Sequence, residues 1–358
     1  MDFENLKYDI QKNKGKIMLA GAAIFFIVVA VIAFKMFGVK FNYGSNSGNV
    51  VSEKYVLADY ILGGNNNGTV NMYDTKTGES LSDSKLGDGD FIYSKSSDMK
   101  QLNALNTTTN ELYKVYPKGK KIKVDKVGIL DIGKNKISSF KYEGNYFVGL
   151  LSDNKKFITI DIKNSKSINV DLKLNASINN FEVTKNNIVF TSGDYICTAK
   201  LSDGKGKKIN IGDISSSIHL TKNKLFVHNS FGADRNKSIL LDINPETLYI
   251  NKAYQFKESL VNMMQTSSDS EILYYSEQFL SSSEGNVKQI IKTIGEEMKN
   301  PSAIMKHTGK GSINKSNSYG YLGYSYYKNE DLLEVYNLRN LEKEYTLKIQ
   351  DDFYMPVY

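Results

Sequence analysis

The sequence predicts an all-β protein: a β-propeller of about seven blades, preceded by a single N-terminal transmembrane helix. Three observations predict it. An uncharged apolar run lies near the N-terminus, a strand-then-turn pattern recurs along the rest of the chain, and β-branched and aromatic runs alternate with Asn, Gly, Ser and Asp. Four short strands in each of about seven units are typical of a propeller. A pair of β-sandwiches without repeats is the alternative.

The apolar run extends from Ile17 to Phe34 and contains no charged residue. As a helix it would be about 27 Å long, close to the thickness of a bilayer core. Lysines are denser before the run than after it, which favours a cytoplasmic N-terminus. A cleaved signal peptide is the alternative, but its apolar core is usually shorter. We therefore assign residues 1–16 to a cytoplasmic tail and 17–38 to a membrane-spanning helix.

The remainder of the chain is expected outside the cytoplasm, with residues 39–52 as a flexible linker and 53–358 as the exported propeller. Cys197 is the only cysteine, so no internal disulfide can form, and this suits a Gram-positive cell envelope. Lysine greatly outnumbers arginine, and Asn, Ile and Tyr are abundant, as in proteins of AT-rich genomes. After residue 40 the chain has 40 basic and 36 acidic residues, a mixed surface that does not indicate nucleic-acid binding.

The repeat consists of an apolar strand that ends in Asp, Asn or another polar residue and is followed by a turn. Val70–Asp74, followed by Thr-Lys-Thr-Gly, is a clear copy. The successive copies end at spacings of 32 to 55 residues, with a mean of about 44, which fits one four-stranded blade per copy. The residues at which the copies end are Asp74, Asn106, Asp161, Lys200, Asp242, Thr293 and Asn337.

Further strands are expected on either side of these copies. Tyr146–Leu151 and Tyr319–Tyr324 are examples of a preceding strand, and Lys208–Ile211 is an example of a following one. The apolar positions within residues 284–312 fit a helical stripe as well as a strand. Phe353–Tyr358 is a spare strand, and we expect it to close the ring as the innermost strand of the first blade.

Two segments resemble the blades of known propellers. Met72–Glu79, MYDTKTGE, looks like a strand-to-strand turn of quinoprotein-type and WD40-like blades, and Tyr195–Ile211 is similar to blades of TolB-like and DUF5050-like propellers of Gram-positive bacteria. The resemblance covers residues of about 51–358. The chain has no tryptophan, so the tryptophan-docking and Trp-Asp motifs of those families are absent. The resemblance therefore implies the architecture only.

The sequence offers no set of residues that calls for catalysis. His219, His228 and His307 lack the spacing of metal ligands. No nucleophile elbow, phosphate loop or dinucleotide fingerprint is present. We predict no catalytic, cofactor-binding or metal-binding residues, no cofactor, and no small-molecule substrate. Cys197 alternates within a strand and is expected to be a small buried hydrophobic residue.

Two groups of residues are candidates for interaction with a partner. A lysine-rich hairpin is either a solvated strand edge or a patch that meets anionic lipid headgroups or wall polymers. A tyrosine cluster is either packing between blades or a partner-binding face. The candidate residues are Lys118, Lys120, Lys121, Lys123, Tyr321, Tyr324 and Tyr326.

These expectations favour a non-enzymatic protein-interaction scaffold, anchored in the cell membrane and facing outward, within a cell-envelope assembly. Its partners would be other membrane or envelope proteins. The alternative is a glycan-binding or glycan-active propeller of the cell wall, a hydrolase or lyase with acids in the funnel of the ring. Paired carboxylates that face one cavity would support that alternative.

Overall fold

The computed structural model describes most of residues 53–358. The predicted tail, the predicted membrane span and most of the linker lie outside the described residues. Among the described residues, no helix is long and apolar enough to cross a membrane. The described residues are 40–42, 56–212, 217–222, 224–230, 237–257, 260–270, 272–280, 286–295, 302–310, 318–321, 324–329, 332–337 and 342–358.

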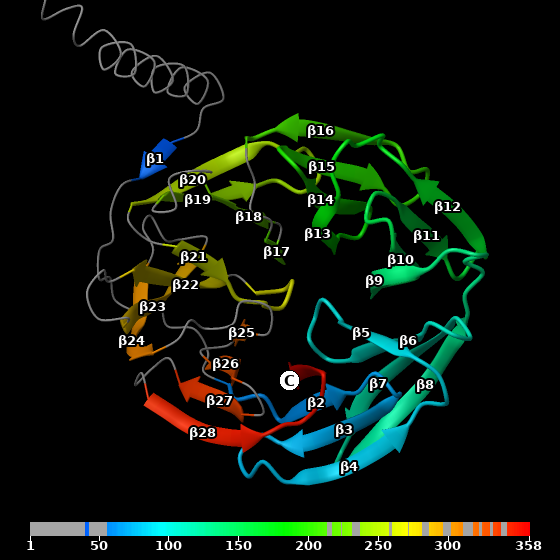
Figure 1. The fold of residues 1–358 in the computed structure, drawn as a ribbon, viewed down its shortest axis with the longest axis horizontal. Helices are drawn as coiled ribbons and strands as arrows, with labels where there is room; N and C mark the ends of the chain where they lie inside the picture. Colours follow the sequence, from blue (N-terminus) through cyan, green and yellow to red (C-terminus); the bar gives the residue numbers. More distant parts are fainter. Residues whose placement is uncertain are drawn as a thin grey trace, which may run out of the picture.

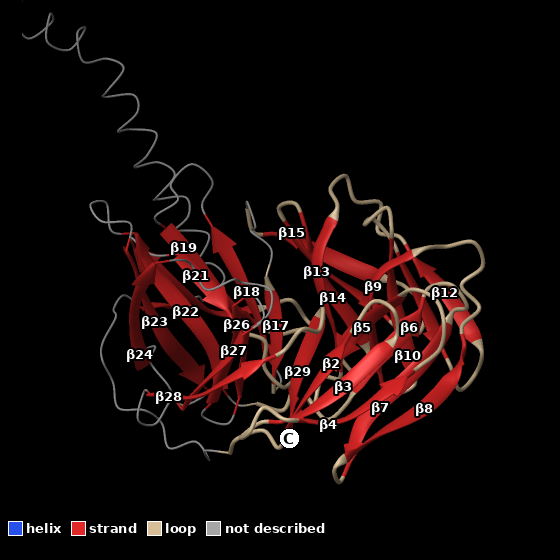
Figure 2. Cartoon of the chain, turned by 60° about the horizontal axis from the view of Figure 1, so that its bottom comes forward, coloured by secondary structure: helices blue, strands red, loops and turns tan. Residues whose placement is uncertain are grey.

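The fold is a β-propeller. Strands of the described residues form seven sheets arranged in a ring, and each blade has four antiparallel strands from the centre outward (Figure 1). Described segments are strands or loops (Figure 2). Blade 1 contains β29 (Phe353–Val357), β2 (Tyr60–Gly64), β3 (Thr69–Asp74) and β4 (Ser80–Lys85). Blade 2 contains β5 (Phe91–Lys95), β6 (Leu102–Asn106), β7 (Glu111–Lys118) and β8 (Lys121–Ile129).

The next three blades follow in chain order. Blade 3 contains β9 (Ile137–Glu143), β10 (Tyr146–Leu151), β11 (Phe157–Asp161) and β12 (Lys166–Val170). Blade 4 contains β13 (Ile178–Val183), β14 (Asn187–Ser192), β15 (Tyr195–Lys200) and β16 (Gly206–Asn210). Blade 5 contains β17 (Ile218–Thr221), β18 (Lys224–Ser230), β19 (Lys237–Ile243) and β20 (Ile250–Lys257).

Two blades complete the ring. Blade 6 contains β21 (Leu260–Met263), β22 (Ile272–Leu280), β23 (Asn286–Gly295) and β24 (Ser302–Lys310). Blade 7 contains β25 (Ser318–Tyr321), β26 (Tyr324–Asn329), β27 (Leu332–Asn337) and β28 (Glu342–Lys348). Residues 284–312, which fitted a helix or a strand, therefore contribute strands β23 and β24.

The core lies between neighbouring blades, which explains the composition of the strands. Every residue of β6 and β14 is buried, because a middle strand is covered by a blade on each face. The outermost β12 and β16 are largely exposed, and β16 carries Lys207 and Lys208. Cys197 is fully buried in the apolar cluster that blades 3 and 4 share, as the sequence predicted.

The C-terminal strand closes the ring as predicted. β29 pairs antiparallel with β2, with Met355 opposite Leu62. Pro356 lies within β29, opposite Ile61, and is tolerated because an innermost strand has a ladder neighbour on one side only. Blade 1 is thus built from both ends of the propeller sequence.

A buried carboxylate reinforces this closure. Asp351 is 1% exposed and accepts hydrogen bonds from Asn65 Nδ2 at 2.9 Å, Asn71 Nδ2 at 2.6 Å and the Tyr73 hydroxyl at 2.6 Å. Gly63 provides the space, since a Cβ there would lie 2.1 Å from Asp351 Oδ2. Asp351 therefore ties the last strand to three positions of blade 1.

One copy of the repeat was assigned to the wrong strand. Asn106 ends β6, the second strand of blade 2, whereas the third strand is β7, which ends at Lys118. Lys118 lies 44 residues after Asp74 and 43 before Asp161, so the corrected period is regular. The turns after Asp74 and Asn106 misled the prediction because each side chain accepts from the backbone N–H groups two and three residues later.

Two other expectations also need correction. The predicted strand Tyr319–Tyr324 is divided between β25 and β26, which pair with each other and place Tyr321 opposite Tyr324. Within the predicted linker, Lys40–Asn42 forms β1, which pairs in parallel with β20 at the outer edge of blade 5 (Figure 1). Phe41 lies opposite Ala253 in this pairing.

Candidate binding face and central channel

One face of the ring carries a broad cavity of about 840 Å³, here called the mouth cavity. It is lined by the turns that join the first and second strands of blades 2 to 6. The first strand lies innermost in each of these blades, so the turns that follow the first strands lie around the centre of the ring (Figure 1). The lining residues include Ser97, Asn145, Lys185, Thr221 and Ser268, with Glu246 from the β19–β20 turn.

A network of charged residues lies on the innermost strands. Lys141 of β9 bonds both carboxylate oxygens of Glu182 of β13, at 3.2 and 3.1 Å. Lys95 of β5 donates to the carbonyl oxygen of Thr266 at 2.8 Å. His219 of β17 is the next titratable group on the inner strands, and Lys95, Glu182 and His219 are all buried. Four consecutive blades thus contribute one member each.

Burial and charge together set the protonation of this network. Burial, with the positive charge of Lys141, lowers the pKa of Lys95 to about 8. Burial lowers the pKa of His219 to about 4, so the imidazole is neutral at pH 7. Burial alone would raise the pKa of Glu182, but the positive charges of Lys141 and Lys95 outweigh it and the pKa is lowered. The network therefore holds an ionised carboxylate between two lysines.

The mouth cavity contains two further carboxylates, and both accept hydrogen bonds. Glu143 accepts from the Ser97 hydroxyl. Glu246 accepts from Asn187 Nδ2 and from the Thr184 hydroxyl at 3.4 Å. These bonds link blade 2 to blade 3 and blade 4 to blade 5, so they stabilise neighbouring turns as well as exposing charge to the cavity.

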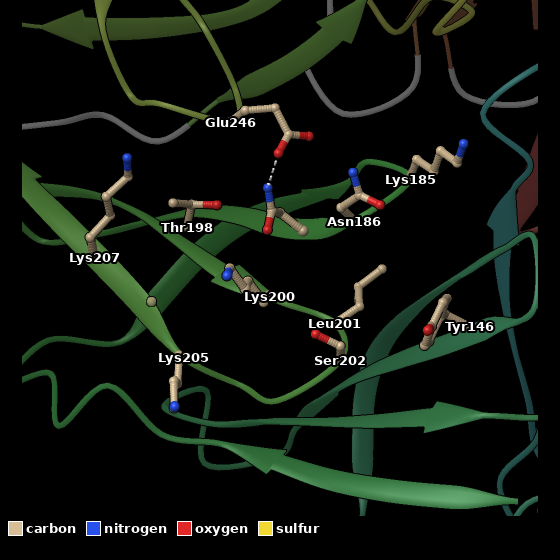
Figure 3. Close-up of a pocket in the computed structure, with 12 residues that line it drawn as sticks. Tyr146, Lys185, Asn186, Thr198, Lys200, Leu201, Ser202, Lys205, Lys207 and Glu246 are labelled. Carbon is tan, nitrogen blue, oxygen red and sulfur yellow. Dashed lines mark hydrogen bonds between the residues drawn. The ribbon is translucent and has the colours of Figure 1, made fainter. Parts of the chain in front are cut away.

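A second cavity of about 580 Å³ lies beside the first, at the turns of blade 4 (Figure 3). We call it the lysine cavity, because four lysines and a single acid, Glu246, contribute to its lining. Glu246 reaches it from the blade 5 turn, and Tyr146 reaches it from blade 3 (Figure 3). The four lysines are Lys185, Lys200, Lys205 and Lys207.

The predicted lysine patch lies elsewhere, on the outer hairpin of blade 2. Lys118, Lys120, Lys121 and Lys123 are exposed there, and they line neither of the two cavities. Lys123 pairs with Asp125 at 3.3 Å and lies 5.5 Å from the centre of the Tyr116 ring. The solvated-edge interpretation of this hairpin thus fits its position, and its role as a patch stays a prediction.

The tyrosine cluster is corrected in part. Tyr324 and Tyr326 are buried, and the Tyr326 hydroxyl accepts from the backbone N–H of Ala58 at 2.8 Å. These two residues pack between blades 7 and 1 instead of forming a partner-binding face. The side chain of Tyr321 lies outside the described part of the structure.

Sequence reasoning missed both the inner network and the lysine cavity. A charged residue within the first strand of successive blades was the available signal for the network. For the cavity, the alternation of Lys205 with Lys207 beyond Lys200 was visible, but the segment was interpreted only as part of a propeller blade. Among the described residues, no three His, Cys, Asp or Glu side chains are grouped closely enough to hold a metal ion.

No family model matches the chain, and no curated protein matches it. A solved structure of a functionally unknown protein from Desulfotomaculum acetoxidans DSM 771 is similar over 81% of this chain and 95% of that chain, with 14% identity and a TM-score of 0.53. U3-55K is 11% identical over 80% of this chain and 89% of its own, with a TM-score of 0.48. The β-propeller domain of Swd1 from Myceliophteria thermophila is 11% identical over 85% of this chain and 100% of its own, with a TM-score of 0.46. At such identities a likeness concerns the fold alone.

Proposed function

We propose that this protein is a membrane-anchored scaffold outside the cytoplasm, whose seven-bladed propeller binds other proteins of a cell-envelope assembly without catalysing a reaction. The observation that supports this proposal is the mouth cavity. Turns from five consecutive blades surround it, and each turn is fixed by a strand ladder, so the face is rigid and wide. A preorganised surface of this kind loses little conformational freedom when a partner binds.

The proposed location depends on the N-terminal sequence. The apolar run Ile17–Phe34 and the lysines before it support an anchor with its N-terminus in the cytoplasm. The resemblance of Tyr195–Ile211 to TolB-like and DUF5050-like blades is consistent with an exported propeller.

The acids near the centre favour binding over proton transfer. A general acid needs a raised pKa, whereas the pKa of Glu182 is lowered by its lysine neighbours. Glu143 and Glu246 are held as acceptors by Ser97, Asn187 and Thr184. These contacts support a structural role for the three carboxylates.

Affinity purification of the full chain from native membranes tests the proposal. Asn145 and Ser152 flank β10, so Asn145→Arg changes the mouth cavity while Ser152→Arg makes the same charge change at the opposite end of the strand. We expect Asn145→Arg to lower the recovery of a co-purifying partner by about fivefold or more, the effect of losing roughly 1 kcal/mol of binding energy. Ser152→Arg should retain the partner. Recovery of the protein alone, or an equal loss for both variants, would contradict the proposal.

A glycan-binding or glycan-active propeller is the second candidate, because Glu143 and Glu246 line the same cavity. Two carboxylates on one cavity are the arrangement that glycosidic hydrolysis uses. Turnover of a wall polysaccharide by the purified chain, lost in both Glu143→Gln and Glu246→Gln, would establish this candidate in place of the scaffold.

A further inference from the structure

The lysine cavity begins where the apolar contact between blades 4 and 5 ends. Val189, Ile196 and Ile209 of blade 4 pack against residues of blade 5. Side chains two residues along a strand share the same face of the sheet. Thr198, opposite Lys207 in the ladder, therefore continues this face toward the turns. Asn187 lies opposite Lys200 on the same face.

A glycine sets how closely the outer strand approaches. Gly206 begins β16, and a Cβ there would lie 2.2 Å from the carbonyl oxygen of Thr198. Only a residue without a side chain permits this approach. Lys205 and Lys207 are consequently held against the end of β15, on the same side of the sheet as Thr198 and Lys200.

The positive charge of this cavity is not neutralised within the described part of the chain. None of Lys185, Lys200, Lys205 and Lys207 has a carboxylate within 4 Å there, although lysines elsewhere do, such as Lys141 and Lys224. Glu246, the one acid in the lining, is bonded to Asn187. The cavity is thus lined by four lysines from two turns and two strands, whose side chains spread in different directions around it (Figure 3).

A buried hydroxyl provides a second, independent indication of a ligand. Thr198 lines the lysine cavity and is 5% exposed, and its Oγ1 has no hydrogen-bond partner among the described residues. Leaving a buried hydroxyl unpaired costs about 1–3 kcal/mol, so such groups normally have a partner. The hydroxyl oxygen itself is enclosed, so a ligand oxygen accepts from it when the side chain turns toward the cavity.

We propose that the lysine cavity binds a phosphate group, with one phosphate oxygen accepting a hydrogen bond from Thr198. A phosphate oxyanion has several acceptor oxygens, so it can contact more than one of the lysines that line the cavity. The volume of about 580 Å³ exceeds that of a phosphate alone and lies in the range of small-molecule sites. The group therefore belongs to a larger ligand, either a phosphorylated small molecule or a phosphodiester polymer. This inference does not depend on the proposed scaffold role.

Calorimetric titration of the purified full chain, in detergent at low salt, tests the proposal with three probes. Inorganic pyrophosphate represents a small phosphorylated ligand, a glycerol-phosphate oligomer represents a phosphodiester polymer, and hexaglutamate supplies carboxylates without phosphate. Binding of at least one phosphate probe, tighter than hexaglutamate, supports the proposal. Which phosphate probe binds more tightly identifies the source.

The variants are matched in charge. Lys200→Gln with Lys207→Gln should weaken phosphate binding by about tenfold or more, because two contacts to charged groups are lost. Lys134→Gln with Lys155→Gln removes the same charge from two exposed turns of blade 3, outside both cavities, and should change the affinity by less than about twofold. Thr198→Val keeps the shape of the side chain, and we expect it to weaken binding several-fold by removing the hydroxyl donor. The melting temperature of each variant verifies folding.

Three results would overturn the proposal. They are no binding of either phosphate probe, an equal loss in the two lysine pairs, and hexaglutamate binding as tight as phosphate, which would indicate an acidic peptide instead. None of these results bears on partner recovery through the mouth cavity, so the two proposals can fail separately.

Discussion

The inner network and the lysine cavity both contain lysines, but the lysine side chains are paired and largely buried in the first and exposed in the second. Lys141 is bonded to Glu182 in the centre of the ring, where both side chains are largely buried. Lys200 and Lys207 lie at an exposed edge of blade 4 with no carboxylate nearby in the described residues. Removing one member of a paired, buried charge leaves the other uncompensated and destabilises the fold, whereas unpaired, accessible charges are available to a ligand. The comparison therefore separates residues that maintain the ring from residues that can serve binding.

The largest loss of stability should come from breaking the ion pair between Lys141 and Glu182. Glu182→Gln removes the negative charge that Lys141 and Lys95 face, and leaves two positive charges in a buried site. We expect the free energy of unfolding to fall by about 3 kcal/mol or more. Denaturant unfolding of the chain measures it, with Lys200→Gln as the control on an exposed lysine. A loss below about 1 kcal/mol would contradict the structural role of the pair.

Removing a second buried carboxylate, Asp351 at the ring closure, should also lower the stability of the fold. Asp351→Ala leaves the donors of Asn65, Asn71 and Tyr73 without their acceptor, and we expect a loss of about 2–3 kcal/mol. Asp352 is the matched control, because it is exposed and accepts one backbone bond, from Asn66 at 3.1 Å. Asp352→Ala should lower stability by less than about 1 kcal/mol. Similar melting temperatures for the two variants would show that Asp351 does not hold the last strand.

The inner network should also make stability depend on pH. His219 faces Glu182, Lys95 and Lys141, and its pKa falls from 6.5 to about 4 on folding. Between these values the unfolded chain binds the proton and the folded chain does not, so stability is present above pH 6.5 and is lost as the pH falls toward 4. We expect a decrease on the order of 2 kcal/mol over this window. Denaturant unfolding at several pH values should show a smaller decrease for His219→Gln. An unchanged slope in that variant would assign the pH dependence to other groups.

The sequence predicted the architecture because propeller repeats leave a local signal. Strand composition and turn chemistry recur along the chain, and the spare strand Phe353–Tyr358 was recognisable from the order of the elements alone. The error at Asn106 has the same origin, since its turn uses the same side-chain bonds as the turn after Asp74. Local chemistry identifies a hairpin, but it does not say which pair of strands the hairpin joins.

The candidate site could not be predicted in the same way, because its members come from different blades. Lys95 and Glu182 lie in separate first strands and meet only when the ring closes. Lys185 and Lys207 come to line one cavity through the packing of one blade, and Glu246 joins the lining from the next blade. The buried hydroxyl of Thr198 has no signature in the sequence at all. The predicted patch at Lys118–Lys123, by contrast, is contiguous in the chain, and this is why it was found.

The smallest change in stability should come from substitutions in the lysine cavity. This measurement would sharpen the comparison between the inner network and the lysine cavity most. Lys205→Gln with Lys207→Gln removes two exposed positive charges that have no carboxylate within 4 Å among the described residues and that repel their neighbours Lys185 and Lys200. Because exposed charges are screened by solvent, we expect the free energy of unfolding to change by less than about 0.5 kcal/mol, in the stabilising direction if at all. Denaturant unfolding at low and at high salt measures this, since added salt should abolish any gain from relieved repulsion. A loss above about 1 kcal/mol would mean that these lysines maintain the fold. Their role would then be structural, like that of Lys141, and not ligand binding.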